Sequence, residues 1–267
     1  MDFKVTLVGA GNMGGAMLRG WLSNGMKPEQ VTVIDPSPSN AMKDYLSLEQ
    51  IVCQSSAEKL DTTDVLLVAV KPQMMEKVLP GLRPLIGDDT VIVSVAAGTQ
   101  LETLTKPFGD VAAIRVMPNT PSLVGRGMSV GCPNAKATSM HKKHVGQLMQ
   151  AIGHMEWVDE EALIDAVTAV SGSGPAYVFH LAECMAAAGV KAGLPPDLAM
   201  TLARETVSGA GELLRQSEDD PTTLRKNVTS PGGTTAAALE VLMGEGGMPA
   251  LFEDAIAAAK QRSEELS

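Results

Sequence analysis

Residues 5–18 read VTLVGAGNMGGAML, and this stretch is the most informative about the fold. An apolar, β-branched run leads into the spacing Gly9-x-Gly11-x-x-Gly14, and a helical pattern follows. That order, at the first strand-to-helix turn, is typical of a dinucleotide-binding turn. Gly9 permits the tight turn, Gly11 lets a pyrophosphate approach the backbone, and Gly14 lets the helix pack closely on the strand. The start of the helix then offers free N–H groups to the phosphates.

Strand patterns alternate with helical patterns from residue 3 to residue 158. The strand-like runs are KVTLVG, VTVID, DVLLVAV, TVIVSVAAG, AAIRVMPN and, more weakly, MEWV. This alternation predicts parallel strands joined by helical crossovers, with both faces of the sheet covered. We therefore expect residues 1–159 to form an α/β, Rossmann-type domain with a doubly wound, mostly parallel sheet.

The strand patterns stop after Glu160. Residues 160–267 are rich in Ala, Leu, Met and Glu, and breaks at SGSGP, GLPP, DDP, SPGG and GEGGMP predict five or six helices. Residues 176–189 are apolar on nearly all sides, so this helix should be buried in a bundle or against a second subunit. We expect an all-α domain that makes a homodimer.

Charge and composition exclude several classes of protein. The formal net charge of −10 argues against a nucleic-acid partner. No apolar run reaches the length of a membrane span, and the first residues do not resemble a secretory signal. Cys53, Cys132 and Cys184 are far apart, which predicts reduced, buried thiols and a cytoplasmic location.

The four histidines show no metal-ligand spacing, so no metal is expected. His141 and His144 lie three residues apart on an expected exposed helix and are interpreted as surface residues. His154 stands alone, and His180 is expected to be a buried core histidine.

The second expected strand ends at Ile34-Asp35, about 20 residues after the last glycine of the turn, where an acid binds a ribose 2′-hydroxyl. Such an acid favours NAD and repels the 2′-phosphate of NADP. Ser37, Ser39 and Asn40 follow and can donate hydrogen bonds to a phosphate, but no basic residue stands beside them before Lys43. The residues therefore leave NADH and NADPH open.

Other polar or small residues follow the expected strands at the edge where open parallel sheets bind ligands. They are Lys71 and Pro72, Ala96 to Gly98, and Asn119 and Thr120. Small residues at 96–98 would let a nicotinamide ring lie flat, whereas Lys71 is equally compatible with a solvated surface lysine.

The stretch SPGGTT, residues 230–235, predicts a neutral anion site. Pro231, Gly232 and Gly233 predict a turn that exposes backbone N–H groups, and Thr234 or Thr235 can cap the next helix. Free N–H groups, hydroxyls and a helix dipole suit a small carboxylate. A plain capped helix without a ligand is the alternative.

Six motifs together resemble one family across nearly the whole chain. VGAGNMG, AVKPQ, SVAAG, VMPNTP, SGSGPAYVF and NVTSPGGTT, in this order and spacing, resemble pyrroline-5-carboxylate reductase. The resemblance implies reduction of L-1-pyrroline-5-carboxylate to L-proline with NADPH or NADH, the last step of proline biosynthesis. It also implies a dimer through the helical domain, often assembled into a decamer. Asp35 stands where many members carry a small or basic residue, which leaves the cofactor preference open.

The resemblance also implies the site residues. Cofactor contacts are expected from Gly9, Gly11, Asn12, Met13, Gly14, Asp35, Ser37, Ser56, Val70, Lys71, Ala97 and Asn227. Substrate contacts are expected from Glu161, Ser230, Gly233, Thr234 and Thr235. Thr235 is the expected catalytic residue, which orients the ring and stabilises its nitrogen, because hydride transfer to C=N needs position rather than a covalent nucleophile.

Two alternatives remain at this point. A β-hydroxyacid dehydrogenase also joins a Rossmann domain to a helical one, but it needs a lysine four residues after Gly174, where Val178 stands. A non-catalytic nucleotide-binding sensor is the second alternative, and the intact SPGGTT stretch argues against it only weakly.

Overall fold

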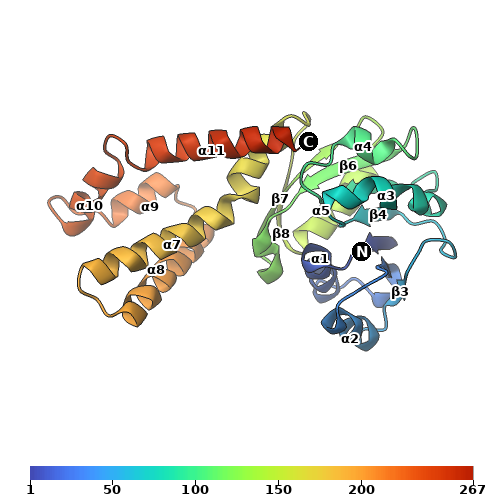
Figure 1. Cartoon of the computed structure of the whole chain (residues 1–267), viewed down its shortest axis with the longest axis horizontal. Helices are drawn as coiled ribbons and strands as arrows, with labels where there is room; N and C mark the ends of the chain where they lie inside the picture. The colour runs from blue at the N-terminus through green and yellow to red at the C-terminus, as the bar shows by residue number, and fades with distance from the viewer. Residues whose placement is uncertain (267) are drawn as a thin grey trace. The chain divides into compact units, whose positions relative to one another are not determined.

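The computed structural model describes residues 1–266, which divide into two compact units (Figure 1). Unit 1 comprises Met1–Gly172 and the chain from Ala259 onward, and unit 2 comprises Ser173–Ala258. The division falls after Gly172, whereas the sequence places the domain boundary after Asp159. The reason is packing, because Ile164 is fully buried against Val130 and Cys132 of unit 1.

Unit 1 is built on one eight-stranded sheet of order β3-β2-β1-β4-β5-β6-β7-β8. Among the described strands, neighbours run parallel except β6 and β7, so β7 and β8 point against the others. The strands are β1 (Val5–Val8), β2 (Val31–Ile34), β3 (Val52–Gln54), β4 (Val65–Val68), β5 (Val91–Ser94), β6 (Ala112–Met117), β7 (Gly127–Pro133) and β8 (Gly153–Trp157).

Both faces of the sheet are buried because alternate residues of each central strand point to opposite sides. In β4, Leu67 joins the core beneath Trp21, while Leu66 joins the core beneath Leu79. The first core includes α1 (Asn12–Ser23), α2 (Asn40–Leu48) and α5 (Ser139–Gln150), and the second includes α3 (Met75–Val78), the 3₁₀ helix η3 (Leu79–Leu85) and α4 (Leu101–Thr105). Unit 1 is thus the predicted three-layer Rossmann-type domain.

Shorter helical segments complete unit 1. They are the 3₁₀ helices η1 (Pro28–Gln30), η2 (Pro72–Met74) and η4 (Thr120–Val124), then α6 (Leu163–Val167) and the π-helix η5 (Thr168–Gly172). The C-terminal part of α11 (Met248–Glu265) also belongs to unit 1.

Six strands coincide with the six expected runs, and two were not expected. β3 is only three residues long and half-exposed, so its sequence carries no clear period. β7 reads GMSVGCP, in which two glycines and a proline interrupt the apolar pattern. It pairs in the antiparallel sense with β6, which an alternating strand–helix reading does not predict.

Unit 2 is all helical, as predicted. It contains α7 (Gly174–Lys191), α8 (Pro196–Gln216), α9 (Pro221–Asn227), α10 (Thr234–Leu242) and the start of α11. α7 packs along α8, and the Tyr177 ring on α7 meets Phe252 on α11 edge to face at 6.2 Å.

Unit 2 leaves many large apolar side chains uncovered within the single chain. On α7, Phe179 is 62% exposed, although this helix was expected to be buried. Others are Val178, Leu181, Met185, Val190, Leu198, Met200, Leu202, Leu213, Leu214, Val241, Leu242 and Leu251. The single chain therefore does not bury α7, and its burial against a second subunit stays a prediction.

Three expectations for polar side chains are wrong. His180 is exposed and pairs with Glu183 at 3.0 Å, because the apolar surface around it is uncovered in the single chain. His141 is buried, and its Nδ1 accepts a hydrogen bond from the Thr138 N–H at the start of α5. His144 is partly buried and stacks on Phe3, so it is not a fully exposed surface residue either. Cys132 is buried as expected, but Cys53 is only partly buried and Cys184 is exposed.

No helix within residues 1–266 is long and apolar enough to cross a membrane. In the same part of the chain, no group of three or more His, Cys, Asp or Glu side chains is placed to hold a metal ion.

Candidate functional site

The turn between β1 and α1 has the geometry that a dinucleotide pyrophosphate requires. Gly9 has φ +90°, which L side chains rarely adopt, and a Cβ on Gly14 would collide with the Gly9 carbonyl oxygen. Gly11 is the N-cap of α1, and no described atom beyond its two chain neighbours lies within 4 Å of where its Cβ would be. Gly9 and Gly14 therefore allow the tight turn, and Gly11 leaves open space at the N-terminus of α1.

A cavity of about 410 Å³ lies at the carboxyl ends of β1, β2 and β4. Apolar side chains such as Val70 and Leu82 form part of its wall, which suits a flat base. Six of the expected cofactor residues line it, namely Gly9, Gly11, Asp35, Ser56, Val70 and Lys71. The exposed Lys71 therefore lies at this cavity.

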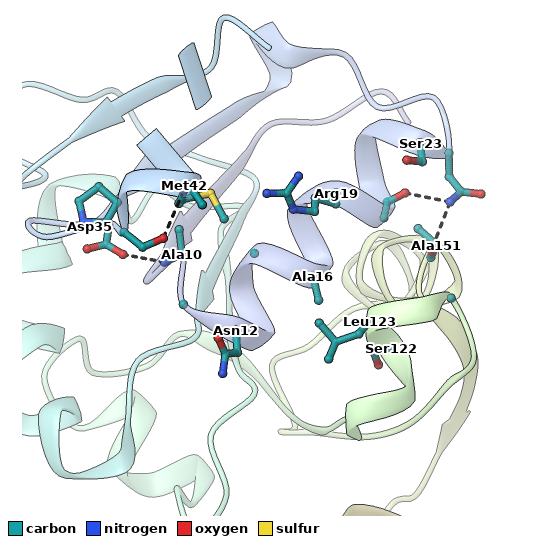
Figure 2. Close-up of a pocket in the computed structure, with 18 of the residues that line it drawn as sticks. Ala10, Asn12, Ala16, Arg19, Ser23, Asp35, Met42, Ser122, Leu123 and Ala151 are labelled. Atoms are coloured by element: carbon teal, nitrogen blue, oxygen red, sulfur yellow. Dashed lines mark hydrogen bonds between the residues drawn. The ribbon is translucent and has the colours of Figure 1, made fainter. Parts of the chain in front are cut away.

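A second cavity, of about 630 Å³, runs between α1 and the loop that leads into α2 (Figure 2). It shares Gly11 and Asp35 with the first cavity, and Ser37 and Ser39 also line it. Arg19 is the one cationic side chain among the described residues of its wall. The polar chemistry of this wall suits a phosphate.

Arg19 is held in place by an aromatic ring. Its guanidinium carbon lies 3.8 Å from the centre of the Tyr45 ring on α2. This cation–π contact restricts a long side chain that is otherwise exposed. Sequence reasoning missed Arg19 because it is far from Ser37 and Ser39 in the chain; its position two helical turns after the glycine turn was the available signal.

Asp35 links the glycine turn to the end of β2. Its Oδ2 accepts a hydrogen bond from the Ala10 N–H at 2.9 Å, and its Oδ1 accepts one from the Ser37 N–H at 2.9 Å. A carboxylate has about four acceptor positions, so it can still receive a ribose hydroxyl. Burial raises the pKa of the neighbouring Cys53 thiol, and the Asp35 charge raises it further.

Four expected cofactor residues lie outside both cavities. Met13 and Gly14 are in the first turn of α1, and Ala97 is exposed in the loop after β5. Asn227 is the last residue of α9, in unit 2, and its side chain is exposed.

The SPGGTT stretch joins α9 to α10 in unit 2. Gly232 has φ +68°, and the Gly233 N–H donates to the Ser230 carbonyl at 3.1 Å, which closes the turn. Gly233 is the N-cap of α10, so the expectation that Thr234 or Thr235 would cap the helix is wrong; they are its first two residues. The extended backbone of Gly233 (φ −81°, ψ 175°) takes the cap position without a side chain.

This arrangement leaves the N-terminus of α10 available to an anion. The first N–H groups of a helix have no acceptor within the helix, and Gly233 supplies no side-chain acceptor. Two hydroxyls, of Thr234 and Thr235, lie at the same point. A Cβ at position 233 would be 2.5 Å from Ser230 Oγ, so a larger residue there would require the Ser230 side chain to move.

Glu161 lies in unit 1, between β8 and α6. Its Oε1 accepts hydrogen bonds from the Leu101 N–H at 2.8 Å and from Arg115 Nη1 at 3.1 Å. Arg115 is in β6 and is only 3% exposed. Sequence reasoning missed Arg115, although one charged residue inside the apolar run AAIRVM was a usable signal.

The Asn119 side chain has a structural role, because it bonds backbone groups of neighbouring elements. It was expected at the ligand edge of the sheet, but its side chain is buried, with Nδ2 donating to the Ser171 carbonyl at 3.1 Å and Oδ1 accepting from the Met128 N–H at 2.8 Å. It therefore ties the loop after β6 to β7 and to the π-helix η5.

Comparison with known proteins decides the family. Residues 161–266 match the model described as pyrroline-5-carboxylate reductase dimerisation, and residues 4–98 match the model described as NADP oxidoreductase, coenzyme F420-dependent. The pyrroline-5-carboxylate reductase of Pseudomonas aeruginosa is 40% identical over 99% of this chain and 97% of its own length. The chain belongs to the pyrroline-5-carboxylate reductase family.

Solved structures of pyrroline-5-carboxylate reductases agree. This chain is similar to the enzyme of Coxiella burnetii, with a TM-score of 0.94 and 31% identity over 100% of this chain and 99% of that one. It is also similar to the Plasmodium falciparum enzyme, solved with NADP bound, with a TM-score of 0.82 and 30% identity over 99% and 98% of the two chains. As a member of this family the chain is an oxidoreductase. The two alternatives, a β-hydroxyacid dehydrogenase and a non-catalytic nucleotide-binding sensor, are therefore rejected.

Proposed function

We propose that the chain reduces L-1-pyrroline-5-carboxylate to L-proline with NADPH or NADH, the last step of proline biosynthesis. This proposal rests on the presence, in one chain, of a turn suited to a dinucleotide and of a helix N-terminus suited to a carboxylate. A glycine turn shaped for a dinucleotide lies in unit 1, and a glycine-capped helix N-terminus with two threonines lies in unit 2. The identity of 40% with a named reductase extends over both units.

Residues of unit 1 hold the dinucleotide in this proposal. Gly9 to Gly14 and the start of α1 bind the pyrophosphate through N–H groups and the helix dipole. Asp35 and Ser56 bind the adenosine ribose, and Val70 covers the base. When bound, the nicotinamide supplies the hydride, and the small side chains of residues 96–98 give it a flat surface. Met13, Lys71, Ala97 and Asn227 complete the proposed cofactor contacts.

Residues of unit 2 bind the substrate carboxylate. Ser230, Gly233, Thr234 and Thr235 provide hydroxyls and free N–H groups at the positive end of the α10 dipole. The site is neutral, so it holds one carboxylate without attracting larger polyanions. Glu161, already oriented by Leu101 and Arg115, is proposed as a further contact to the substrate ring.

Thr235 is the proposed catalytic residue. Its hydroxyl is too weak an acid to protonate the imine outright near neutral pH. It orients the ring and donates a hydrogen bond to the nitrogen as that nitrogen becomes an amine. The rate gain then comes from position, with the imine carbon presented for hydride attack.

Two side chains act in opposite directions on cofactor preference. The Asp35 carboxylate repels a 2′-phosphate and accepts a ribose hydroxyl, which favours NADH. Arg19, with Ser37 and Ser39, supplies one charge and two hydroxyls in the second cavity, which favours NADPH. We infer that the enzyme uses both cofactors.

We further propose a homodimer formed through unit 2, where the uncovered apolar side chains gather. Dimers are proposed to assemble into a decamer, and the enzyme is proposed to act in the cytoplasm. The net charge of −10 supports a small-molecule substrate with no nucleic-acid partner.

The test is a comparison of substrates in one assay. Oxidation of NADPH and of NADH is followed at matched concentrations with pyrroline-5-carboxylate, with a 3-oxo acid, and with neither. We expect oxidation only with pyrroline-5-carboxylate, with proline as the product. Oxidation only with the 3-oxo acid, or none at all, overturns the proposal.

A further inference from the structure

Four polar side chains from distant parts of the sequence meet inside unit 1, and we call them the Arg115 network. Arg115 Nη1 is 3.1 Å from Glu161 Oε1, and Arg115 Nη2 is 3.9 Å from Asp165 Oδ1. Ser263, near the end of α11, donates from Oγ to Asp165 Oδ1 at 2.6 Å. Arg115, Asp165 and Ser263 are all at least nine-tenths buried.

The charges of this network do not balance by themselves. One guanidinium faces two carboxylates, so Arg115 alone cannot pair fully with both, and its contact with Asp165 is long. The Ser263 hydroxyl gives Asp165 a short hydrogen bond in a buried place, where an unsatisfied carboxylate oxygen is strongly unfavourable. The Ser263 hydroxyl thus fastens the end of α11 to α6, beside Arg115 of β6.

The same network fastens the loop of residues 95–100, which follows β5. Glu161 Oε1 accepts the Leu101 N–H at 2.8 Å at the start of α4, just after this loop. Before it, the Ala96 N–H donates to Ser94 Oγ at 3.2 Å. Glu161 therefore links the Arg115 side chain to the backbone at the end of the loop that carries Ala97.

The last turn of the described chain lies against this loop. Gly98 has φ +72°, and a Cβ on it would be 2.6 Å from the Leu266 carbonyl oxygen. The Leu266 N–H donates to the Ser263 carbonyl at 3.2 Å, so the residue that meets Gly98 is tied to the residue that bonds Asp165. The bond between Ser263 and Asp165 therefore fixes the turn at 263–266, and this turn supports the loop at 96–98.

We propose that Ser263, Asp165 and Arg115 are positioning residues for the reaction. They hold the 96–98 loop, and with it the surface for the nicotinamide, and they orient the Glu161 carboxylate through its Oε1. This inference rests on the proposed function for the role of that loop. In this proposal the C-terminal end of α11 supports the reaction indirectly, through the 96–98 loop, without touching substrate or cofactor.

The test uses three full-length variants. Ser263→Ala removes only the hydroxyl, and Ser263→Thr restores one. Arg262→Ala is the matched control, since Arg262 is the preceding residue, is 65% exposed, and pairs with Glu265 at the surface. Each variant is measured by steady-state kinetics, dinucleotide titration, thermal unfolding and amide hydrogen exchange of residues 95–101.

For Ser263→Ala we expect kcat to fall about ten-fold, the scale set by one hydrogen bond to a charged group. Dinucleotide affinity should change less than about two-fold, because most of the proposed dinucleotide contacts lie in the glycine turn and the two cavities, away from the loop that carries Ala97. Exchange at residues 95–101 should accelerate, with Tm nearly unchanged. Ser263→Thr should recover most of the turnover, and Arg262→Ala should match the unmodified enzyme.

Equal kcat in Ser263→Ala and Arg262→Ala overturns the inference, as does unchanged exchange at residues 95–101. A loss of kcat that only follows a loss of Tm or of dinucleotide affinity also overturns it, because the role would then be general stability. The exchange measurement needs no turnover, so failure of the unmodified enzyme to reduce pyrroline-5-carboxylate would reject the proposed function separately.

Discussion

The Asp35 carboxylate accepts a hydrogen bond from the backbone N–H of Ala10 at 2.9 Å. This bond joins the end of β2 to the middle of the glycine turn, and the second oxygen of Asp35 binds the Ser37 N–H. Asp35 therefore has two duties, because it shapes the turn and places a negative charge where the two cavities meet.

Cofactor preference should respond oppositely to two substitutions. Asp35→Ser removes the charge that repels a 2′-phosphate, so the ratio of kcat/KM for NADPH over NADH should rise. Arg19→Met removes the cation of the second cavity and should lower that ratio, by about ten-fold if one charge-assisted bond is lost. Steady-state kinetics with both cofactors measures each ratio.

Asp44→Ser is the control for this pair, since Asp44 is an exposed acid on the neighbouring helix α2 and lines neither cavity. It should leave the ratio unchanged. An equal loss of both cofactors in Asp35→Ser would mean that the bond to Ala10 is its whole role.

Thr235→Ala tests the substrate site. It removes one hydroxyl from the N-terminus of α10, and a hydrogen bond to a charged group is worth roughly 1.5–3 kcal/mol, so kcat/KM should fall about 10- to 150-fold. Dinucleotide affinity, measured by direct titration, should be unaffected. Thr222→Ala, at an exposed position on α9, is the control. Full turnover in Thr235→Ala would remove Thr235 from the site.

Phe179→Glu tests the dimer. The ring is 62% exposed on α7, and a charge there would be buried against the second subunit, so sedimentation should show monomers. Leu48→Glu is the control, because Leu48 is 79% exposed on α2 of unit 1 and should leave the dimer intact. Dissociation by the control alone would place the interface on unit 1.

Stability should depend on pH through His144, which stacks on Phe3 at 4.1 Å. Burial lowers the pKa of this ring below 6.5, His141 and Lys143 lower it further, and Asp64 opposes them. The unfolded chain then binds the proton more readily, so stability is retained above about pH 7 and falls as pH drops through 6.5 towards the folded-state pKa.

In His144→Phe this part of the pH dependence should disappear. Denaturant unfolding at several values between pH 5 and pH 8 compares the variant with the unmodified chain. Parallel curves would show that other groups account for the loss of stability in acid.

The fold could be predicted from the sequence because the patterns that indicate it are local. The glycine turn of residues 9–14 and the apolar runs of the parallel strands are readable without knowing which segments pair. β7 was missed for the same reason, since its glycines and proline hide a strand whose partner and direction depend on the rest of the sheet.

The support around the site could not be predicted in the same way. Arg19 and Tyr45 come from two helices, and Arg115, Asp165 and Ser263 come from three distant segments, so no spacing in the sequence reveals either contact. His180 was misjudged because its helix is apolar as a whole, and apolarity does not say whether the same chain or a partner covers it.

The fate of the hydride tests the proposed reaction most directly. The enzyme is supplied with pyrroline-5-carboxylate and with NADPH carrying deuterium on both positions of the nicotinamide C4, and the proline formed is analysed by mass spectrometry and NMR. The expected product is L-proline with one deuterium, at the carbon that was doubly bonded to nitrogen. Proline without deuterium, or unreacted pyrroline-5-carboxylate, would contradict it.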